Sequence, residues 1–295
     1  MVIDSHMHLI RLKNFDEEVY SKVYSMPNET DLDTLVGWYK EAGISRVVCM
    51  GQDMSRLWNT SFGEEYVREA YRRYPDIFIP FASMEPVGRG NNFNQEAYDE
   101  LERSIREDNI KGVLFTPPYG QYKSNDKWCY PFYELIQKKD IVMQYHHSAQ
   151  MGPAIFAPTP FAKLENLNEV IIDFPKMKVV VEHLGYPWSE QLFVLMTNCP
   201  QMYTDLAMTY GRPRWTAWQL VLAREYGVLD RVMFASDYVS YSYDYFSDNP
   251  AQDFKNWINI VRYGLNEINK QSGWPLLTDS EVESILYGAA ARLYN

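Results

Sequence analysis

Two histidines, His6 and His8, stand one residue apart near the start of the chain, in the stretch VIDSHMHLI. The residues around them are mostly apolar, which favours a buried β-strand. Residues i and i+2 of a strand point to the same face, so both imidazoles can face one point. Imidazole nitrogen is a common ligand of divalent metal ions. The pair therefore indicates either part of a metal site or two hydrogen-bonded core histidines.

The other three of the five histidines also end apolar runs. His146 and His147 close one run and His183 closes the next. Neighbouring residues of a strand point to opposite faces, so only one of His146 and His147 can join a shared site directly. Asp237 follows the apolar run in VMFASDYV, where an unpaired carboxylate would be costly to bury. Three histidines and a carboxylate predict a site for a divalent ion with one position left open for water or substrate.

The elements that must position these residues alternate along the chain. Eight apolar, β-branched runs are separated by about eight amphipathic segments, and no glycine-rich turn follows the first run. This pattern predicts an α/β fold, a single-domain (β/α)8 TIM barrel over residues 1–295, in preference to a doubly wound open sheet. The expected strands are Val2–Leu9, Arg46–Gly51, Ile77–Met84, Gly112–Thr116, Ile141–His147, Lys178–His183, Met202–Ala207 and Arg231–Ser236. In such barrels the catalytic residues lie at the C-terminal ends of the strands, where the histidines and Asp237 fall.

Two helices have readable ends. Thr30 or Asp31 is the expected cap of the helix that stops before Gly43, and Asp279 or Ser280 the expected cap of the last helix.

Composition narrows the classes of partner. The net charge of −11 and the isoelectric point of about 5.0 argue against nucleic acid or an anionic membrane as partner, but not against a small anionic substrate. Cys49, Cys129 and Cys199 are widely spaced, as expected for free thiols in a reducing compartment. No secretory signal and no membrane-length apolar run is evident, so we expect a cytoplasmic protein. Phosphate-loop, G-x-S-x-G and dinucleotide motifs are also missing.

The sequence resembles the amidohydrolase superfamily, in particular the amidohydrolase 2 branch, which includes aminocarboxymuconate-semialdehyde and resorcylate-type decarboxylases. The stretches that carry the resemblance occur in the family's order and span nearly the whole chain: IDSHMHL, DIVMQYHHS, DFPKMKVVVEHLGYPW, MFASDY and ILYGAAARLY. The resemblance implies a metal-dependent TIM barrel.

The resemblance also implies roles for single residues. It makes His6, His8, His146 and Asp237 the metal ligands, with His146 preferred over His147. It makes Asp237 a proton shuttle and His183 a proton-handling group.

The sequence departs from the family's pattern at a few positions. The fourth strand, in KGVLFTPPYG, lacks the lysine or glutamate that bridges two metals in binuclear relatives, so we expect one ion, zinc before manganese. Ala289 stands where the family tail has asparagine, and Glu182 is expected to face the helix layer.

Three functional classes follow. The first is a metal-dependent hydrolase of an amide, lactone or related small carbonyl substrate. The second is a metal-dependent decarboxylase of a small carboxylic acid, aromatic acids included, and the third is a non-catalytic barrel. Candidate substrate contacts are Arg212 and Arg214, Arg56, and Trp188 as an aromatic wall, although a solvated surface charge is as compatible with each arginine. The long connection 10–29 and the tyrosine-rich loop 237–248 could also serve the site, and a homodimer is compatible with the aromatic-rich composition.

Overall fold

The computed structural model describes residues 1–9, 11, 13, 29–149, 157–239 and 249–294. Most of the connection after the first strand and most of the tyrosine-rich loop therefore lie outside the described residues. Within the described part, no helix combines the length and the apolar character needed to cross a membrane.

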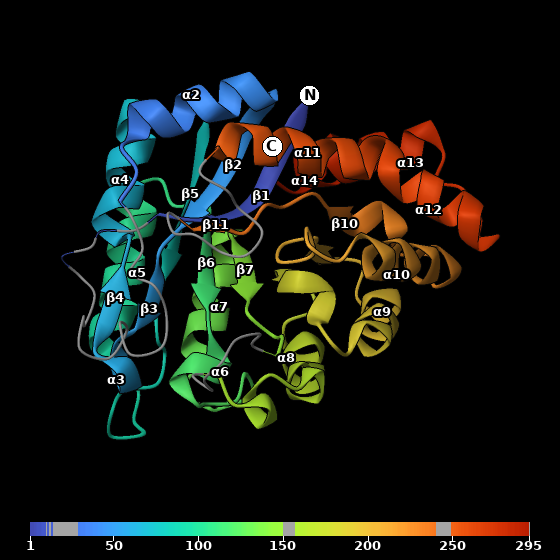
Figure 1. The fold of residues 1–295 in the computed structure, drawn as a ribbon. Coiled ribbons are helices and arrows are strands. Elements are labelled where there is room, and N and C mark those ends of the chain that lie inside the picture. Colours follow the sequence, from blue (N-terminus) through green and yellow to red (C-terminus); the bar gives the residue numbers. More distant parts are fainter. Residues whose placement is uncertain (10, 12, 14–28, 150–156, 240–248, 295) are drawn as a thin grey trace.

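The core of the molecule is one parallel sheet that closes on itself (Figure 1). Its order is β10-β9-β8-β7-β6-β5-β2-β1-β11. The strands are β1 (Val2–His8), β2 (Ile44–Met50), β5 (Phe78–Ser83), β6 (Gly112–Phe115), β7 (Val142–Tyr145), β8 (Lys178–Val181), β9 (Met202–Asp205), β10 (Val232–Met233) and β11 (Tyr238–Val239). All eight predicted strands are present, some of them shorter than expected.

Closure depends on the chain segment that carries both β10 and β11. Val232 of β10 pairs with Thr204 of β9, and Tyr238 of β11 pairs with Met7 of β1, both in parallel register. Between these pairings the backbone N–H of Asp237 donates to the His6 carbonyl at 3.0 Å. This one segment therefore serves as the eighth strand and joins the last strand to the first, which confirms the predicted (β/α)8 barrel.

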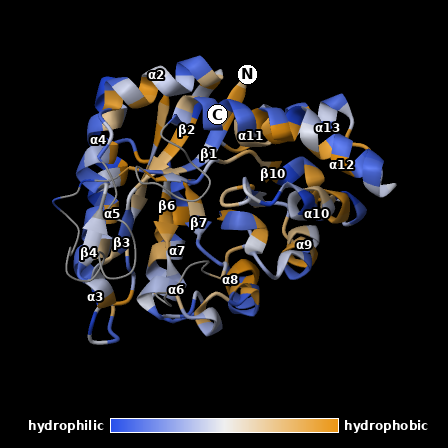
Figure 2. Ribbon diagram, in the orientation of Figure 1, coloured by the Kyte–Doolittle hydropathy of each residue, from blue (hydrophilic) through white to orange (hydrophobic). Residues whose placement is uncertain are grey.

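Helices lie outside the strands (Figure 1). In Figure 2 the strands are mostly hydrophobic, whereas most helices carry hydrophilic and hydrophobic residues side by side, as expected for helices that cover a sheet with one face. The longer helices are α2 (Leu32–Ala42), α4 (Glu64–Arg73), α5 (Gln95–Glu107), α7 (Tyr130–Lys139), α8 (Leu167–Asp173), α9 (Ser189–Asn198), α10 (Pro213–Glu225), α11 (Pro250–Asn259), α12 (Leu265–Ser272), α13 (Asp279–Glu283) and α14 (Ala289–Tyr294).

The barrel interior is closed at one end by the C-terminal helix. Alternate strand residues such as Ile3, Val48 and Phe81 form one buried cluster inside the barrel. Ala289 and Leu293 of α14 pack into the same cluster. Ala289 is fully buried there, so the position at which this chain departs from the family tail contributes to packing below the site.

Helix ends agree only in part with the predictions. Asp31 caps α2 through a bond from the Thr34 N–H, and Gly43 ends it in the left-handed conformation, both as expected. The last helical segment begins one residue earlier than predicted, because Thr278 caps α13 in a capping box with Glu281.

The structure adds a small hairpin that the sequence did not predict. Antiparallel strands β3 (Gln52–Met54) and β4 (Thr60–Phe62), joined by the short helix α3 (Ser55–Trp58), follow β2 at the site end of the barrel. Each strand has three residues, too few for a hydrophobic period to be recognised.

Candidate metal centre

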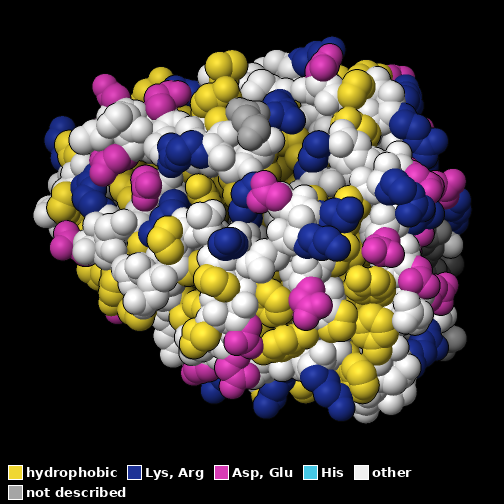
Figure 3. Space-filling view, turned by 180° about the vertical axis from the view of Figure 1, so that it is seen from behind, with side chains coloured by type: hydrophobic (Ala, Val, Ile, Leu, Met, Phe, Trp, Pro, Cys, Tyr) yellow, Lys and Arg dark blue, Asp and Glu magenta, His cyan; other side chains and the backbone are white. Residues whose placement is uncertain are grey.

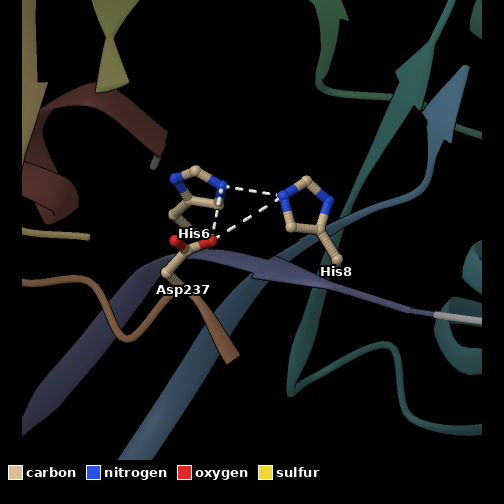
Figure 4. Close-up of side chains that lie close together, drawn as sticks. All are labelled: His6, His8 and Asp237. Atoms are coloured by element: carbon tan, nitrogen blue, oxygen red, sulfur yellow. Dashed lines mark hydrogen bonds and ion pairs between the residues drawn. The ribbon is translucent and has the colours of Figure 1, made fainter. Parts of the chain in front are cut away.

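Three predicted ligands converge where the first and last strands meet (Figure 4). The Nε2 atoms of His6 and His8 are 3.1 Å apart. Oδ1 of Asp237 lies 3.5 Å from Nε2 of His6 and 3.8 Å from Nε2 of His8. Both histidines come from β1 and point to one side of it, as their spacing predicts. Asp237 reaches them from between β10 and β11.

The far sides of the two rings are held by the protein. Nδ1 of His8 lies 3.0 Å from the Gly51 carbonyl, which can only accept, so this nitrogen carries the hydrogen. Nδ1 of His6 lies 3.3 Å from Oδ2 of Asp205, a fully buried carboxylate at the end of β9. Both rings therefore direct Nε2 towards a shared point, an orientation typical of metal-binding histidines.

The distances fit a divalent ion. Ligand atoms about 2.1 Å from a tetrahedral centre lie about 3.4 Å from one another. The three distances among His6, His8 and Asp237, from 3.1 to 3.8 Å, are close to that value. Two imidazole nitrogens and a carboxylate oxygen also form a donor set that Zn²⁺ and Mn²⁺ accept.

A second group of donors adjoins the first. Oε2 of Glu182 lies 3.0 Å from Nδ1 of His146 and 3.4 Å from Nε2 of His183. The other oxygen, Oε1, lies 3.6 Å from Nε2 of His6 and accepts from the side-chain amide of Gln144 at 2.8 Å. The structure thus places His146 and His183 around Glu182, next to His6.

The expectation for Glu182 was wrong. This side chain is 1% exposed and contacts the histidines, whereas strand alternation with His183 would turn it towards the helices. The reason is local: β8 ends at Val181, and the next residues form a tight turn in which His183 and Leu184 have φ of 58° and 53°. The turn breaks the alternation, so both Glu182 and His183 face the site.

After β7, by contrast, successive side chains still alternate between the two faces, so the adjacent residues His146 and His147 point to opposite sides. His146 joins Glu182 on the inner side. His147 lies on the outer side, where its ring nitrogens meet the Ser124 hydroxyl at 2.6 Å and the Ala162 carbonyl at 3.1 Å. All five histidines are buried, and Figure 3 shows none on the reverse face of the molecule. The geometry therefore favours His146 over His147 as the member of the site.

Burial and charge act against each other on these groups. Burial lowers the pKa of His6, but the carboxylates of Glu182, Asp205 and Asp237 outweigh it and raise the pKa to about 10. Burial and the neighbouring His6 lower the pKa of His8 to about 4. Burial raises the pKa of Glu182, but the surrounding imidazoles dominate and hold it well below its usual range. The cluster is thus rich in carboxylate charge and favours a cation.

Two acidic residues of this region were missed by the sequence analysis. Asp205 ends an apolar strand just as Asp237 does, which is the signal that could have found it. Asp4, two residues before His6, is fully buried and accepts from the backbone N–H of Ser236 at 2.9 Å. Burial, partly offset by this bond, raises the pKa of Asp4 to about 6. Both residues fix the backbone and rings that present the donors.

The predicted substrate contacts lie in different surroundings. Arg212 is half-buried at the start of α10 and donates to the Met208 carbonyl at 3.4 Å, whereas Arg214 is exposed in the first turn of that helix. Trp188 is half-buried and packs against the core beside α9. Tyr119, not predicted, lies with its ring 5.1 Å from that of His146. Roles in substrate binding remain predictions for Arg212, Arg214 and Trp188.

The Arg56 side chain donates hydrogen bonds to residues near the β3–β4 hairpin. Its Nε donates to the Gly88 carbonyl at 3.2 Å, and its terminal nitrogens donate to the Gly120 carbonyl and the Asn91 side chain. Its backbone N–H donates to Oε2 of Glu85 at 2.8 Å. The guanidinium is therefore engaged within the protein, and a contact with substrate remains a prediction.

Glu85 makes stability depend on pH. This carboxyl is 1% exposed, and burial and the nearby Asp53 raise its pKa from 4.5 to about 9. The folded protein keeps a proton that the unfolded chain releases, so the free energy of unfolding falls as pH rises from about 5 towards 9. Between pH 6 and pH 9 the free energy of unfolding of Glu85→Gln should fall by roughly 2–4 kcal/mol less than that of the unchanged protein, measured by urea unfolding. Equal losses in both proteins would contradict this.

The sequence matches one protein family over nearly its whole length. A model of the amidohydrolase family matches residues 3–295. No curated protein matches the sequence significantly.

Solved structures of related shape cover nearly the whole chain. An uncharacterized TIM-barrel protein from Bordetella bronchiseptica is 21% identical with a TM-score of 0.70, over 99% of this chain and 97% of the other. A probable 2-pyrone-4,6-dicarboxylic acid hydrolase from Acinetobacter baumannii is 16% identical with a TM-score of 0.71, over 99% and 98%. A dihydroxybenzoic acid decarboxylase from a Polaromonas species, with bound manganese, is 15% identical with a TM-score of 0.65, over 99% and 96%. At these identities the likeness shows the fold.

Proposed function

Because the chain belongs to the amidohydrolase family, we propose that it is a metal-dependent hydrolase of a small carbonyl substrate, an amide, lactone or related ester. The observation that carries the proposal is the convergence of His6, His8 and Asp237 at distances that suit one divalent ion. Zinc suits this donor set best, and manganese is the second choice.

The chain's own residues have separate tasks in this proposal. A divalent ion supplies Lewis acidity, which polarises a substrate oxygen and acidifies water. Asp237, whose side chain is 13% exposed, accepts the proton of the attacking water and returns it to the leaving group. His183, whose pKa is raised because Glu182 and Asp237 outweigh burial, donates to the oxygen on which charge develops. Asp205 and the Gly51 carbonyl keep the two β1 rings in orientation.

A decarboxylase is the second candidate. It is supported by the likeness to the Polaromonas decarboxylase, which uses the same fold. In this case the arginines at the start of α10, Arg212 and Arg214, bind the substrate's carboxylate, and Asp237 or His183 protonates the carbon that loses CO₂. Assays on lactones, amides and hydroxybenzoates separate the two: hydrolysis products support the first, and release of CO₂ the second.

Metal removal tests the class as a whole. We expect treatment with a chelator to abolish turnover and added Zn²⁺ or Mn²⁺ to restore it, because the Lewis acid is lost and regained. Metal content per chain, measured by plasma mass spectrometry on untagged protein, should fall and recover in parallel. Protein that takes up no metal even after soaking would show that the histidines are structural, and the enzyme proposal would fall.

A further inference from the structure

The two ring nitrogens of His183 lie in different surroundings. Nε2 lies 3.1 Å from Nδ1 of His146 and 3.4 Å from Oε2 of Glu182. Nδ1 has no hydrogen-bond partner among the described residues, although the side chain is only 3% exposed. A buried polar atom without a partner is costly, and native proteins keep such atoms mainly where they have a task. The unpaired Nδ1 is therefore a candidate for contact with a substrate.

The hydrogen on Nε2 can be placed from its neighbours. Nδ1 of His146 lies 3.0 Å from Oε2 of Glu182, and a carboxylate only accepts hydrogen bonds, so Nδ1 of His146 carries a hydrogen. That nitrogen cannot also accept from His183. The acceptor that remains for Nε2 of His183, within the described part of the chain, is the same oxygen of Glu182. The His183 ring is therefore held by Glu182 through Nε2.

Other residues fix the Glu182 carboxylate itself. The side-chain amide of Gln144 donates to Oε1 of Glu182 at 2.8 Å. Gln144 is fully buried on β7, in register with Val180 of β8, so its own position is set by the sheet. Oε1 also lies 3.6 Å from Nε2 of His6. With both oxygens facing fixed partners, the carboxylate is held in one orientation and can orient a ring in turn.

The backbone of His183 is held as firmly as its ring. Its N–H donates to Oδ1 of Asp205 at 2.9 Å, and its φ of 58° lies in the left-handed region. Residues other than glycine keep this conformation only where the surroundings enforce it, and such residues cluster at active sites. The side chain is thus fixed at its Cα and at Nε2, as a preorganised donor requires.

We propose that Glu182 is a positioning residue for His183, and that it holds Nε2 of the ring so that Nδ1 is the nitrogen that donates to the substrate oxygen. Gln144 supports this role by fixing Glu182. The inference rests on the proposed function, because it assigns the working nitrogen of a residue in that mechanism.

Nuclear magnetic resonance tests the hydrogen positions without turnover. Full-length protein with isotope-labelled histidine is loaded with Zn²⁺, and the His183 signals are identified by their absence from His183→Gln. Long-range proton–nitrogen spectra should show a hydrogen on Nε2 of His183 in the unchanged protein. In Glu182→Gln this hydrogen should exchange faster with water. An Nε2 without hydrogen in the unchanged protein would overturn the inference.

Steady-state kinetics show whether Glu182 acts through His183. Glu182→Gln should lower kcat about 10–100-fold, with little change in KM and with unchanged metal content, because the ring loses its orientation. In the His183→Ala background the same substitution should lower kcat by no more than about threefold, since no ring is left to position. Glu85→Gln is the matched control. It removes an equally buried carboxyl that contacts no histidine among the described residues, and should leave kcat unchanged.

Each other outcome has a definite meaning. Equal losses of kcat in the two backgrounds would show that Glu182 does not act through His183 and would overturn the inference. Loss of bound metal in Glu182→Gln would make Glu182 a metal ligand and would overturn it as well. If the unchanged protein turned over no lactone, amide or ester, the proposed function would fall, and the spectra would still decide whether Glu182 holds His183 through Nε2.

Discussion

Asp237→Asn should lower kcat by a factor of about 10³ or more while the protein remains folded. The amide keeps the shape of the side chain and an oxygen towards His6 and His8, but it cannot accept a proton from water. The loss therefore falls on the chemical step, and KM should change little in comparison. Steady-state kinetics on the identified substrate, with metal content measured in the same sample, check the prediction.

The control for this variant is Asp76→Asn, an exposed aspartate between α4 and β5. It should keep full activity, and circular dichroism should be the same for both variants. If Asp237→Asn turned over substrate at the normal rate, with its metal in place, Asp237 could not be the proton shuttle, and the proposed mechanism would have to be abandoned.

Gly63→Ala should strongly destabilise the protein. Gly63 precedes α4 with φ of 97°, and an added Cβ would lie 2.2 Å from the Leu9 carbonyl oxygen and 2.6 Å from Cα of Gly51. Both neighbours are backbone, which cannot rotate away. We expect the free energy of unfolding to fall by more than about 3 kcal/mol, measured by urea unfolding.

The effect should reach the metal centre, because the Gly51 carbonyl holds His8. Metal affinity should therefore fall together with stability. Gly43→Ala is the matched control: its φ is 78°, but nothing lies within 4 Å of the added Cβ. It should cost only about 1 kcal/mol, the conformational penalty alone. Equal losses in both variants would show that the contacts with Leu9 and Gly51 are not the cause.

The sequence was informative where regular geometry continues to the site. His6 and His8 face one side because β1 is extended throughout. His146 and His147 point to opposite sides because the alternation of side chains continues for two residues beyond β7. The order of the strands followed from length and alternation alone. These features depend on local period, which a sequence carries directly.

The failures arise where the backbone departs from that period. The left-handed residues His183 and Leu184 turn Glu182 into the site, and neither is a glycine whose presence would have announced such a conformation. The hairpin β3–β4 is too short for its pattern to be recognised. Arg56 donates hydrogen bonds to Gly88 and Gly120, which are far from it in sequence, so these contacts could not be predicted from a local pattern.

The closing of the barrel by one segment has a consequence for synthesis of the protein. The Ser5 hydroxyl donates a hydrogen bond to the Phe234 carbonyl at 2.6 Å across that closure, and the two residues are 229 positions apart in sequence. A growing chain on the ribosome has His6 and His8 from the outset but lacks Asp237 until most of the protein has been made. The ligand set proposed for the metal, His6, His8 and Asp237, is therefore complete only after the barrel has closed. In the proposed function, capture of the ion is therefore a late step of synthesis that only a chain with a closed barrel can complete.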